Sequence, residues 1–280
     1  MGDVAGRTFL ITGANTGIGK ETVRALASRD ACVYLACRSQ ESGRRAVEEI
    51  SAQTGNRDLK LLSLDLGDLA SVRRCAEEFL ATGEPLHVLI NNAGVAGARG
   101  MTESGFERTF GTNHVGPFLL TSLLLDRLRS SAPARIVNVA SVAHYDAPGI
   151  DWEAVRRPTR TITGMREYRV SKLANVLHAQ ELGRRLEGTG VTSYSLHPGV
   201  IASDIWRRVP WPVRSLMKAR MDTPEQGART SLYCATSDAV AGESGRYYDD
   251  CRAKEPAAAA TAELAGELWR RTEEWIGDGE

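Results

Sequence analysis

Residues 12–20 read TGANTGIGK, between an apolar run that ends at Thr12 and a helical pattern that begins at Gly17. Glycine lacks a Cβ atom and so permits a tight turn and a close approach of backbone to a ligand. The N-terminus of the helix offers free N–H groups and a partial positive charge to a pyrophosphate. This order of strand, glycine loop and helix predicts a dinucleotide-binding site, whose candidate contacts are Gly13, Asn15, Thr16, Gly17, Ile18 and Gly19.

The same residues also approximate a phosphate-binding P-loop, written ANTGIGKE from Ala14. A P-loop needs Ser or Thr directly after its lysine to bind Mg²⁺. Glu21 stands there, and its carboxylate would point toward the triphosphate. We therefore reject a nucleoside triphosphatase unless Thr22 substitutes, and keep the dinucleotide interpretation.

Short apolar runs alternate with longer helical patterns along the chain. The pattern predicts strands at 7–12, 32–37, 59–64, 85–91, 134–141, 191–197 and 245–250, and helices at 17–29, 41–52, 69–80, 106–128, 165–186 and 224–234. Such alternation predicts an α/β fold, a doubly wound parallel sheet with helices on both faces. A terminal helix should dock Leu268, Trp269 and Trp275, and no linker divides the chain into two domains.

Composition excludes several classes of protein. The chain has 280 residues, 42% of them apolar, and its 35 Lys and Arg balance 35 Asp and Glu. A disordered chain would combine low hydrophobicity with high net charge. A nucleic-acid binder that depends on a basic footprint would carry excess positive charge. We expect neither.

The cysteines and apolar runs bear on location and metal binding. Five cysteines, an odd number without zinc-like spacing, favour reduced thiols, and the five histidines are scattered, so we expect no metal. No signal peptide is recognisable, and no apolar run approaches the ~20 residues of a membrane span. These features predict a cytoplasmic protein.

The second predicted strand bears on the choice of dinucleotide. An Asp or Glu at its end binds the ribose 2′-hydroxyl of NAD, whereas Arg accommodates the 2′-phosphate of NADP. The strand ends in Cys37-Arg38-Ser39, without an acid. The planar fork of Arg38 suits phosphate, and Ser39 can add a donor. We expect NADP(H), although Arg38 could also be an ordinary surface residue.

Four polar side chains form a candidate catalytic set. Tyr168 and Lys172 are four residues apart on a predicted helix and so share a face. A nearby ammonium favours the phenolate and lowers the pKa of a tyrosine, which suits the pair to acid/base work. Ser141 follows a strand, where α/β sheets place ligands, and could polarise a substrate carbonyl. Asn113 lies in the long apolar helix as a candidate water-holding residue.

Together these motifs resemble the short-chain dehydrogenase/reductases. The matching order is TGxxxGxG from Thr12, NNAG from Asn91, Asn113, Ser141, YxxxK from Tyr168, and PG from Pro198. ITGANTGIGKET, LACRS, LINNAGV, NVASVAH, SKLANVL and LHPGV are similar to the retinol-dehydrogenase-like branch. The resemblance covers nearly the whole chain.

The resemblance implies a single-domain Rossmann-type sheet, with a cofactor half at about 1–140 and a catalytic and substrate half at about 141–280. It implies hydride transfer with Tyr168 as acid/base, Lys172 lowering its pKa and holding the ribose, Ser141 orienting the carbonyl, and Asn113 in a proton relay. The implied cofactor contacts further include Asp65 near the adenine, Leu66, Asn92, Ala93, Gly94, Pro198, Gly199, Val200 and Ser203, the last where many relatives have Thr.

The substrate side is less determined. The segment 201–222 carries Ile205 and Trp206 among apolar residues and five basic ones. It could be a lid over an apolar substrate, a surface helix on an anionic membrane, or a packed helix with a solvated basic face. His144 and Tyr145 follow Ser141 and are expected at the pocket mouth, so the expected substrate contacts are Ser141, His144, Tyr168, Ile205 and Trp206.

Two functions follow from this set. The first is an NADP(H)-dependent oxidoreductase that interconverts an apolar aldehyde or ketone and its alcohol. The second is a non-catalytic NADP(H)-binding sensor or interaction protein on the same fold, because fold does not fix function. The intact set of four side chains favours the enzyme. The expected partners are a small apolar substrate and, if the two long helices pair, a second copy of the chain; a monomer is equally consistent.

Overall fold

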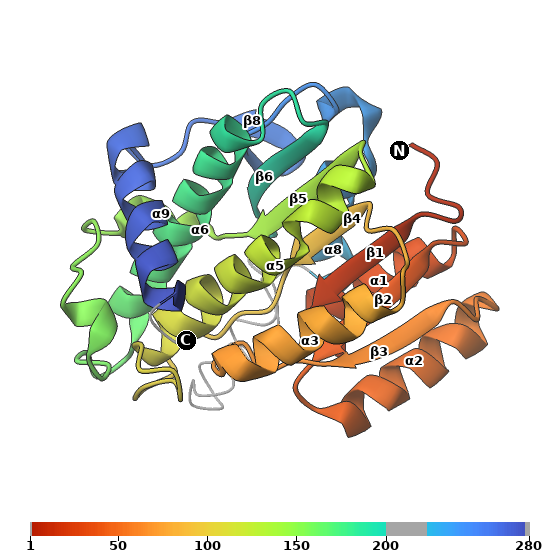
Figure 1. Ribbon diagram of the computed structural model, residues 1–280, viewed down its shortest axis with the longest axis horizontal. Helices are drawn as coiled ribbons and strands as arrows, with labels where there is room; N and C mark the ends of the chain where they lie inside the picture. Colours follow the sequence, from red (N-terminus) through yellow and green to blue (C-terminus); the bar gives the residue numbers. More distant parts are fainter. Residues whose placement is uncertain (1, 200–222, 278–280) are drawn as a thin grey trace.

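The computed structural model describes residues 2–199 and 223–277. Within them, strands form one sheet in the order β3-β2-β1-β4-β5-β6-β7-β8 (Figure 1). All neighbouring strands are parallel except β7 and β8. The strands are β1 (Thr8–Thr12), β2 (Cys32–Cys37), β3 (Leu59–Ser63), β4 (Val88–Asn91), β5 (Ala134–Val139), β6 (Val191–His197), β7 (Arg246–Asp249) and β8 (Arg252–Lys254).

Helices cover both faces of this sheet. One face packs against α1, α2 and α8, and the other against α3, α5 and α6, with α9 outside α5 and α6 (Figure 1). The helices are α1 (Gly17–Ala27), α2 (Gln40–Thr54), α3 (Leu69–Ala81), α4 (Arg108–Phe110), α5 (Gly116–Ser130), α6 (Met165–Arg185), α8 (Pro224–Thr236) and α9 (Ala262–Gly277). Short turns of helix lie at η1 (Gly111–Val115), η2 (Val142–Asp146), η3 (Ala154–Arg156) and η5 (Asp238–Val240).

The central strands explain why their sequences are continuously apolar. Every residue of β1, β4 and β5 is buried, because helices lie above and below them. Strands covered on both faces do not show the in–out alternation of a half-exposed sheet. The predicted doubly wound α/β fold is therefore confirmed.

The position of the site follows from the order of the strands. From β1 the chain continues to β2 and β3 on one side, whereas β4, β5 and β6 extend the sheet on the other. The order reverses between β1 and β4, and α/β sheets bind ligands at the carboxyl ends of strands at such a switch point. The glycine loop after Thr12 and the NNAG motif after Asn91 both lie there.

Most predicted elements are present, with two differences. The helix expected at 106–128 is interrupted: α4 leads into the π-helical turn η1, and α5 begins only at Gly116. Strand β8, whose three side chains are exposed at the sheet edge, was not expected. The docking of the terminal helix is confirmed, since Leu268 and Trp269 are buried and Trp275 packs against Phe106.

Candidate active site

The glycine loop is shaped by two different constraints. A Cβ on Gly19 would lie 2.4 Å from the carbonyl oxygen of Gly13, so only glycine fits where α1 passes the loop. Gly17 instead has a φ of 55°, and a Cβ there would meet nothing within 4 Å. The sequence predicted a tight turn. The structure adds that Gly19 is required because the backbone of Gly13 packs closely against it.

The NNAG motif fastens this loop to the end of β4. The Thr12 hydroxyl accepts hydrogen bonds from the backbone N–H groups of Asn92 and Ala93, both at 3.0 Å. The Asn92 amide donates to the carbonyl oxygen of Thr12 at 2.8 Å. These bonds hold the carboxyl ends of β1 and β4 in one fixed arrangement.

A cavity of about 680 Å³ opens over these two strand ends. The N-terminus of α1 borders it, with Thr16 as the N-cap; no side chain caps this end, and no acid lies in its first turn. Free N–H groups at a helix N-terminus fit a pyrophosphate. The lining residues are Gly13, Asn15, Thr16, Gly17, Ile18, Gly19, Arg38, Asn92, Ala93, Gly94, Val95, Ala96, Ala98, Val139, Ala140, Tyr168, Lys172, Pro198 and Pro224.

The structure also answers the P-loop alternative. Thr22, the one hydroxyl that could replace the missing Mg²⁺ ligand, is 1% exposed and donates to the carbonyl oxygen of Ile18 at 2.8 Å. The Glu21 carboxylate pairs with Arg24 on the same helix. Neither side chain is available to a triphosphate.

The end of β2 borders the cavity at its predicted place. Arg38 lines it with a side chain that is 76% exposed, and its one ion pair among the described residues, to Asp65, is long at 3.7 Å. Ser39 caps α2 by accepting from the N–H of Ser42, whose hydroxyl accepts in turn from Asn15 of the glycine loop. Arg38 is thus available to a ligand. Three other predicted cofactor contacts do not line the cavity: Ser39, Asp65 and Leu66. Asp65 is connected to the cavity by its ion pair with Arg38, which does line it.

Tyr168 and Ser141 meet as predicted. The Ser141 hydroxyl is hydrogen-bonded to the Tyr168 phenol, and this bond lowers the pKa of Tyr168. Burial has the larger effect, so the pKa of Tyr168 is raised above its ordinary value. The resemblance implied a lowered pKa through Lys172. The Lys172 Nζ lies 5.7 Å from the centre of the phenol ring. Burial, opposed by the Ser141 hydrogen bond, sets the direction of the shift, so the pKa of Tyr168 is raised and not lowered.

Lys172 is deeply buried at the carboxyl end of β5. Its Nζ donates to the carbonyl oxygen of Val139 at 2.8 Å, and Asn175 donates to the same oxygen at 3.2 Å. Burial lowers the pKa of Lys172 to about 8. A Cβ on Gly94 would lie 3.4 Å from both Lys172 Nζ and Asn113 Oδ1. Gly94, the last residue of the NNAG motif, therefore lies next to both of these polar groups.

Asn113 lies in the π-helical turn η1, and single π-turns inside helices are frequent at functional sites. Its amide donates to the Val95 carbonyl at 2.9 Å and to the Ser171 hydroxyl at 3.0 Å, and its Oδ1 accepts from the Val95 N–H at 2.8 Å. Asn113 therefore joins the NNAG loop to α6, one residue before Lys172.

The expectation that His144 contacts substrate is corrected. The ring is fully buried, its Nδ1 lies 2.6 Å from the Ser141 carbonyl, and its Nε2 accepts from the Ala257 N–H at 3.2 Å. Tyr247 packs on it with ring centres 4.6 Å apart. His144 holds the Ser141 backbone in place and has no free nitrogen for a ligand, whereas Tyr145 is 45% exposed.

Several site residues fall outside the prediction or outside the described structure. Val139 and Pro224 line the cavity and were missed, as were Val95, Ala96, Ala98 and Ala140. For five of these six residues the signal was position, just before Ser141 or just after NNAG, whereas Pro224 at the start of α8 had no such signal. Gly199 has a φ of 95°. Val200, Ser203, Ile205, Trp206 and the remainder of the 201–222 segment lie outside the described residues.

A cavity over the switch point of a parallel sheet has an uncapped helix end at one side and Tyr168 and Lys172 at the other, and Ser141, which does not line it, is hydrogen-bonded to Tyr168. This arrangement defines a dinucleotide-binding oxidoreductase. A family profile described as short chain dehydrogenase matches residues 7–154. The chain belongs to the short-chain dehydrogenase/reductase family, in its retinol-dehydrogenase-like branch.

The comparisons behind this assignment span nearly the whole chain. The chain is 48% identical over 255 residues to retinol dehydrogenase 12 of Homo sapiens, covering 88% of this chain and 78% of that protein. It is 43% identical over 289 residues to dehydrogenase/reductase SDR family member 13 of Homo sapiens, covering 100% and 75%.

Solved structures agree with the fold. An uncharacterized protein from Mycobacterium paratuberculosis superposes with a TM-score of 0.80 at 32% identity, over 99% of this chain and 96% of that one. The RhlG/NADP active-site complex of Pseudomonas aeruginosa gives 0.70 at 27% identity, over 88% and 95%.

Proposed function

We propose that this protein is an NADP(H)-dependent oxidoreductase that interconverts an apolar aldehyde or ketone and its alcohol. The choice of coenzyme rests on Arg38, which is exposed at the edge of the cavity after β2 and whose one ion pair within the described part of the chain, to Asp65, is long. A guanidinium there favours the additional phosphate of NADP, and no acid stands at the strand end to select NAD.

The side chains of this chain supply binding and proton transfer. The uncapped end of α1 and the glycine loop bind the pyrophosphate, and Lys172 lies within the same cavity to hold a ribose. A nicotinamide dinucleotide supplies or accepts the hydride. Ser141 orients the carbonyl oxygen, and Tyr168 protonates it during reduction or takes the proton during oxidation. A raised pKa favours the protonated phenol that reduction requires.

Two observations support an apolar substrate. The compared proteins of the same branch are named retinol dehydrogenases. In the turn that follows Ser141 in the chain, two large apolar side chains are exposed: Val142 at 39% and Tyr145 at 45%. A cytoplasmic location and the oligomeric state stay predictions from the sequence. In the described part of the chain, no helix combines the length and apolar character that crossing a bilayer demands.

The first test is NADPH oxidation against a panel of carbonyls, from small polar ketones to retinal and long-chain aldehydes. Turnover should be confined to the large apolar members. Tyr168→Phe should lower kcat by about a hundredfold or more while NADPH still binds. An absence of turnover by the wild-type protein, with tight NADPH binding, would instead favour the non-catalytic sensor.

The coenzyme is tested separately with Arg38→Asp. The substitution places a carboxylate where the 2′-phosphate would lie, so the ratio of kcat/KM for NADPH to that for NADH should fall by at least about tenfold. Arg45→Asp, on the exposed face of α2 and paired with Glu41, is the matched control and should leave the ratio unchanged. An unchanged ratio in Arg38→Asp would refute the assignment to NADP(H).

A further inference from the structure

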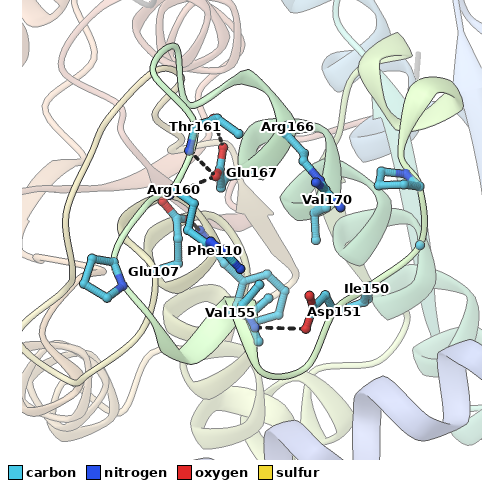
Figure 2. A pocket seen from close by; sticks show the side chains of 14 residues that line it. Glu107, Phe110, Ile150, Asp151, Val155, Arg160, Thr161, Arg166, Glu167 and Val170 are labelled. Carbon is cyan, nitrogen blue, oxygen red and sulfur yellow. Dashed lines mark hydrogen bonds between the residues drawn. The ribbon is translucent and has the colours of Figure 1, made fainter.

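A second cavity, of about 460 Å³, lies apart from the coenzyme site. Its walls come from the loop between Pro148 and Thr161, the first turns of α6, and Glu107 and Phe110 (Figure 2). The two cavities share no lining residue. Pockets of roughly 300–1,000 Å³ accommodate small molecules, so this volume suffices for a ligand.

Helix α6 separates this cavity from the catalytic residues. Successive residues of a helix are about 100° apart, which places Arg166 and Val170 roughly 160° around the axis from Tyr168. Arg166, Glu167 and Val170 line the second cavity, whereas Tyr168 and Lys172 line the first. A molecule in the second cavity therefore contacts α6 on the side opposite the Tyr168 side chain.

The floor of the second cavity is apolar. Three side chains that are each at most 9% exposed line the cavity from three different elements: Phe110, Val155 and Val170. Pro148, Ile150, Ala154 and Pro158 extend the apolar surface along the loop. Such a floor gains free energy by burying hydrocarbon, at about 25 cal/mol per Å².

The three acidic side chains at this cavity already accept hydrogen bonds from backbone N–H groups. Glu107 accepts from Thr109 and Phe110, Asp151 from Glu153 and Ala154, and Glu167 from Arg160 and Thr161. Burial also raises the pKa of Glu107, which favours its uncharged form. These acids are committed to holding the loop and the start of α4.

The two guanidinium groups at the cavity are not committed in this way. Within residues 2–199 and 223–277, neither Arg160 nor Arg166 forms an ion pair or a side-chain hydrogen bond, although Arg157 nearby pairs with Glu153. Figure 2 shows both side chains among the residues that enclose the cavity, one from the loop and one from α6. A guanidinium is a planar fork of donors that matches a carboxylate.

We propose that this cavity binds an apolar molecule that carries a single carboxylate, such as a medium-chain fatty acid. The hydrocarbon lies on the floor formed by Phe110, Val155 and Val170, and the carboxylate is bound by Arg160 and Arg166. The site is independent of the coenzyme site, and its occupant is not the compound that is oxidised or reduced.

The test is calorimetric titration of the full chain with octanoate and, as an uncharged match, octan-1-ol. The double variant Arg160→Met and Arg166→Met keeps apolar stems but removes both charges, and octanoate affinity should fall by at least about tenfold. Arg157→Met, on the same loop but outside the cavity, should leave the affinity unchanged. NADPH binding should be the same in all three proteins, which also verifies that the variants fold.

A second variant tests the location without touching charge. Ala154→Phe fills the cavity from its wall and should abolish octanoate binding while NADPH binding persists. The proposal is overturned if wild-type protein binds no octanoate, if octan-1-ol binds as tightly as octanoate, or if the double arginine variant retains wild-type affinity.

Discussion

At the scale of single residues, burial opposes charge on both members of the Tyr168–Lys172 pair. It raises the pKa of the phenol and lowers the pKa of Lys172 to about 8. A lysine in water holds its proton to a pH near ~10.4. In the folded protein we therefore expect the ammonium to lose its proton near pH 8, within the range where enzymes are assayed.

This shift predicts the pH profile of carbonyl reduction. If the charged form of Lys172 binds coenzyme and supports Tyr168, kcat/KM should fall as pH rises through about 8, because deprotonation there removes the charge. Lys172→Met should lower the rate roughly a hundredfold and remove this limb of the profile. Steady-state rates measured between about pH 6 and pH 10 decide the matter; a wild-type profile that stays level through pH 8 would contradict it.

Two helical glycines give a matched pair for the packing of the loop. Glycine costs about 1 kcal/mol relative to alanine within a helix, so Gly266→Ala in α9, where a Cβ meets nothing within 4 Å, should stabilise the protein by up to that amount. Gly19→Ala gains the same propensity, but its Cβ would lie 2.4 Å from a backbone oxygen. It should lower Tm and weaken NADPH binding; chemical denaturation and coenzyme titration compare the two, and equal stabilisation would refute the packing argument.

His144 shows why some residue roles could not be predicted. Its place three residues after Ser141 favoured a position at the pocket mouth. Its actual direction is determined by the Ala257 N–H and the Tyr247 ring, which lie more than 100 residues later in the chain. Motif spacing identifies groups on one helix or one strand end, as with Tyr168 and Lys172, but contains no information about such distant contacts.

At the scale of elements, the strand and helix order was predictable because each central strand is a short apolar run and longer helical patterns separate these runs. The π-helical turn at Gly111–Val115 was not. Apolar residues continue through it with helical spacing, so the sequence predicted one helix at 106–128. The interruption depends on Asn113 binding the Val95 backbone and on the close approach of Gly116 to the Leu66 carbonyl.

That turn should therefore be sensitive to Asn113. Asn113→Ala leaves the N–H and carbonyl of Val95 without their partner and should destabilise the protein by about 1–3 kcal/mol. It should also lower kcat, because the same side chain reaches Ser171 beside Lys172. Ser122→Ala on α5 removes a hydroxyl that donates to the Phe118 carbonyl of its own helix and is the control. Equal unfolding free energies and rates for the two variants would show that Asn113 has no special role.

At the scale of the whole molecule, α9 covers one face of α5 and α6. Trp269 packs on Phe118 with ring centres 4.8 Å apart and on His178 at 5.8 Å, and Arg185 lies 4.4 Å from its ring. The sequence predicted that the terminal helix docks, but its periodicity could not specify against which helices. The sequence left two alternatives for the long helices, an interface with a second copy or burial by neighbouring elements. On the face that α9 covers, the structure shows burial by a neighbouring element.

Beneath α9 lie two buried histidines, which we expect to make the stability of the fold depend on pH. His114 and His178 are almost completely buried with ring centres 5.8 Å apart; burial lowers the pKa of His178 to about 3 and that of His114 well below its ordinary value. Phe118, Trp269 and the Thr272 hydroxyl face them, and no carboxylate among the described residues is bonded to either ring. A proton on either ring would therefore lack a counter-charge.

The sign of the effect follows from these lowered pKa values. Below the unfolded value of about 6.5 the unfolded chain binds protons that the folded protein excludes, so stability falls as pH falls, by about 1.4 kcal/mol per histidine at one pH unit below it. Unfolding free energies from urea titrations between about pH 8 and pH 5 should show this loss. His178→Leu removes one of the two protonation sites, and its stability should depend less steeply on pH than that of the wild type by up to one bound proton. Parallel pH dependences for the two proteins would assign the acid sensitivity to carboxylates elsewhere.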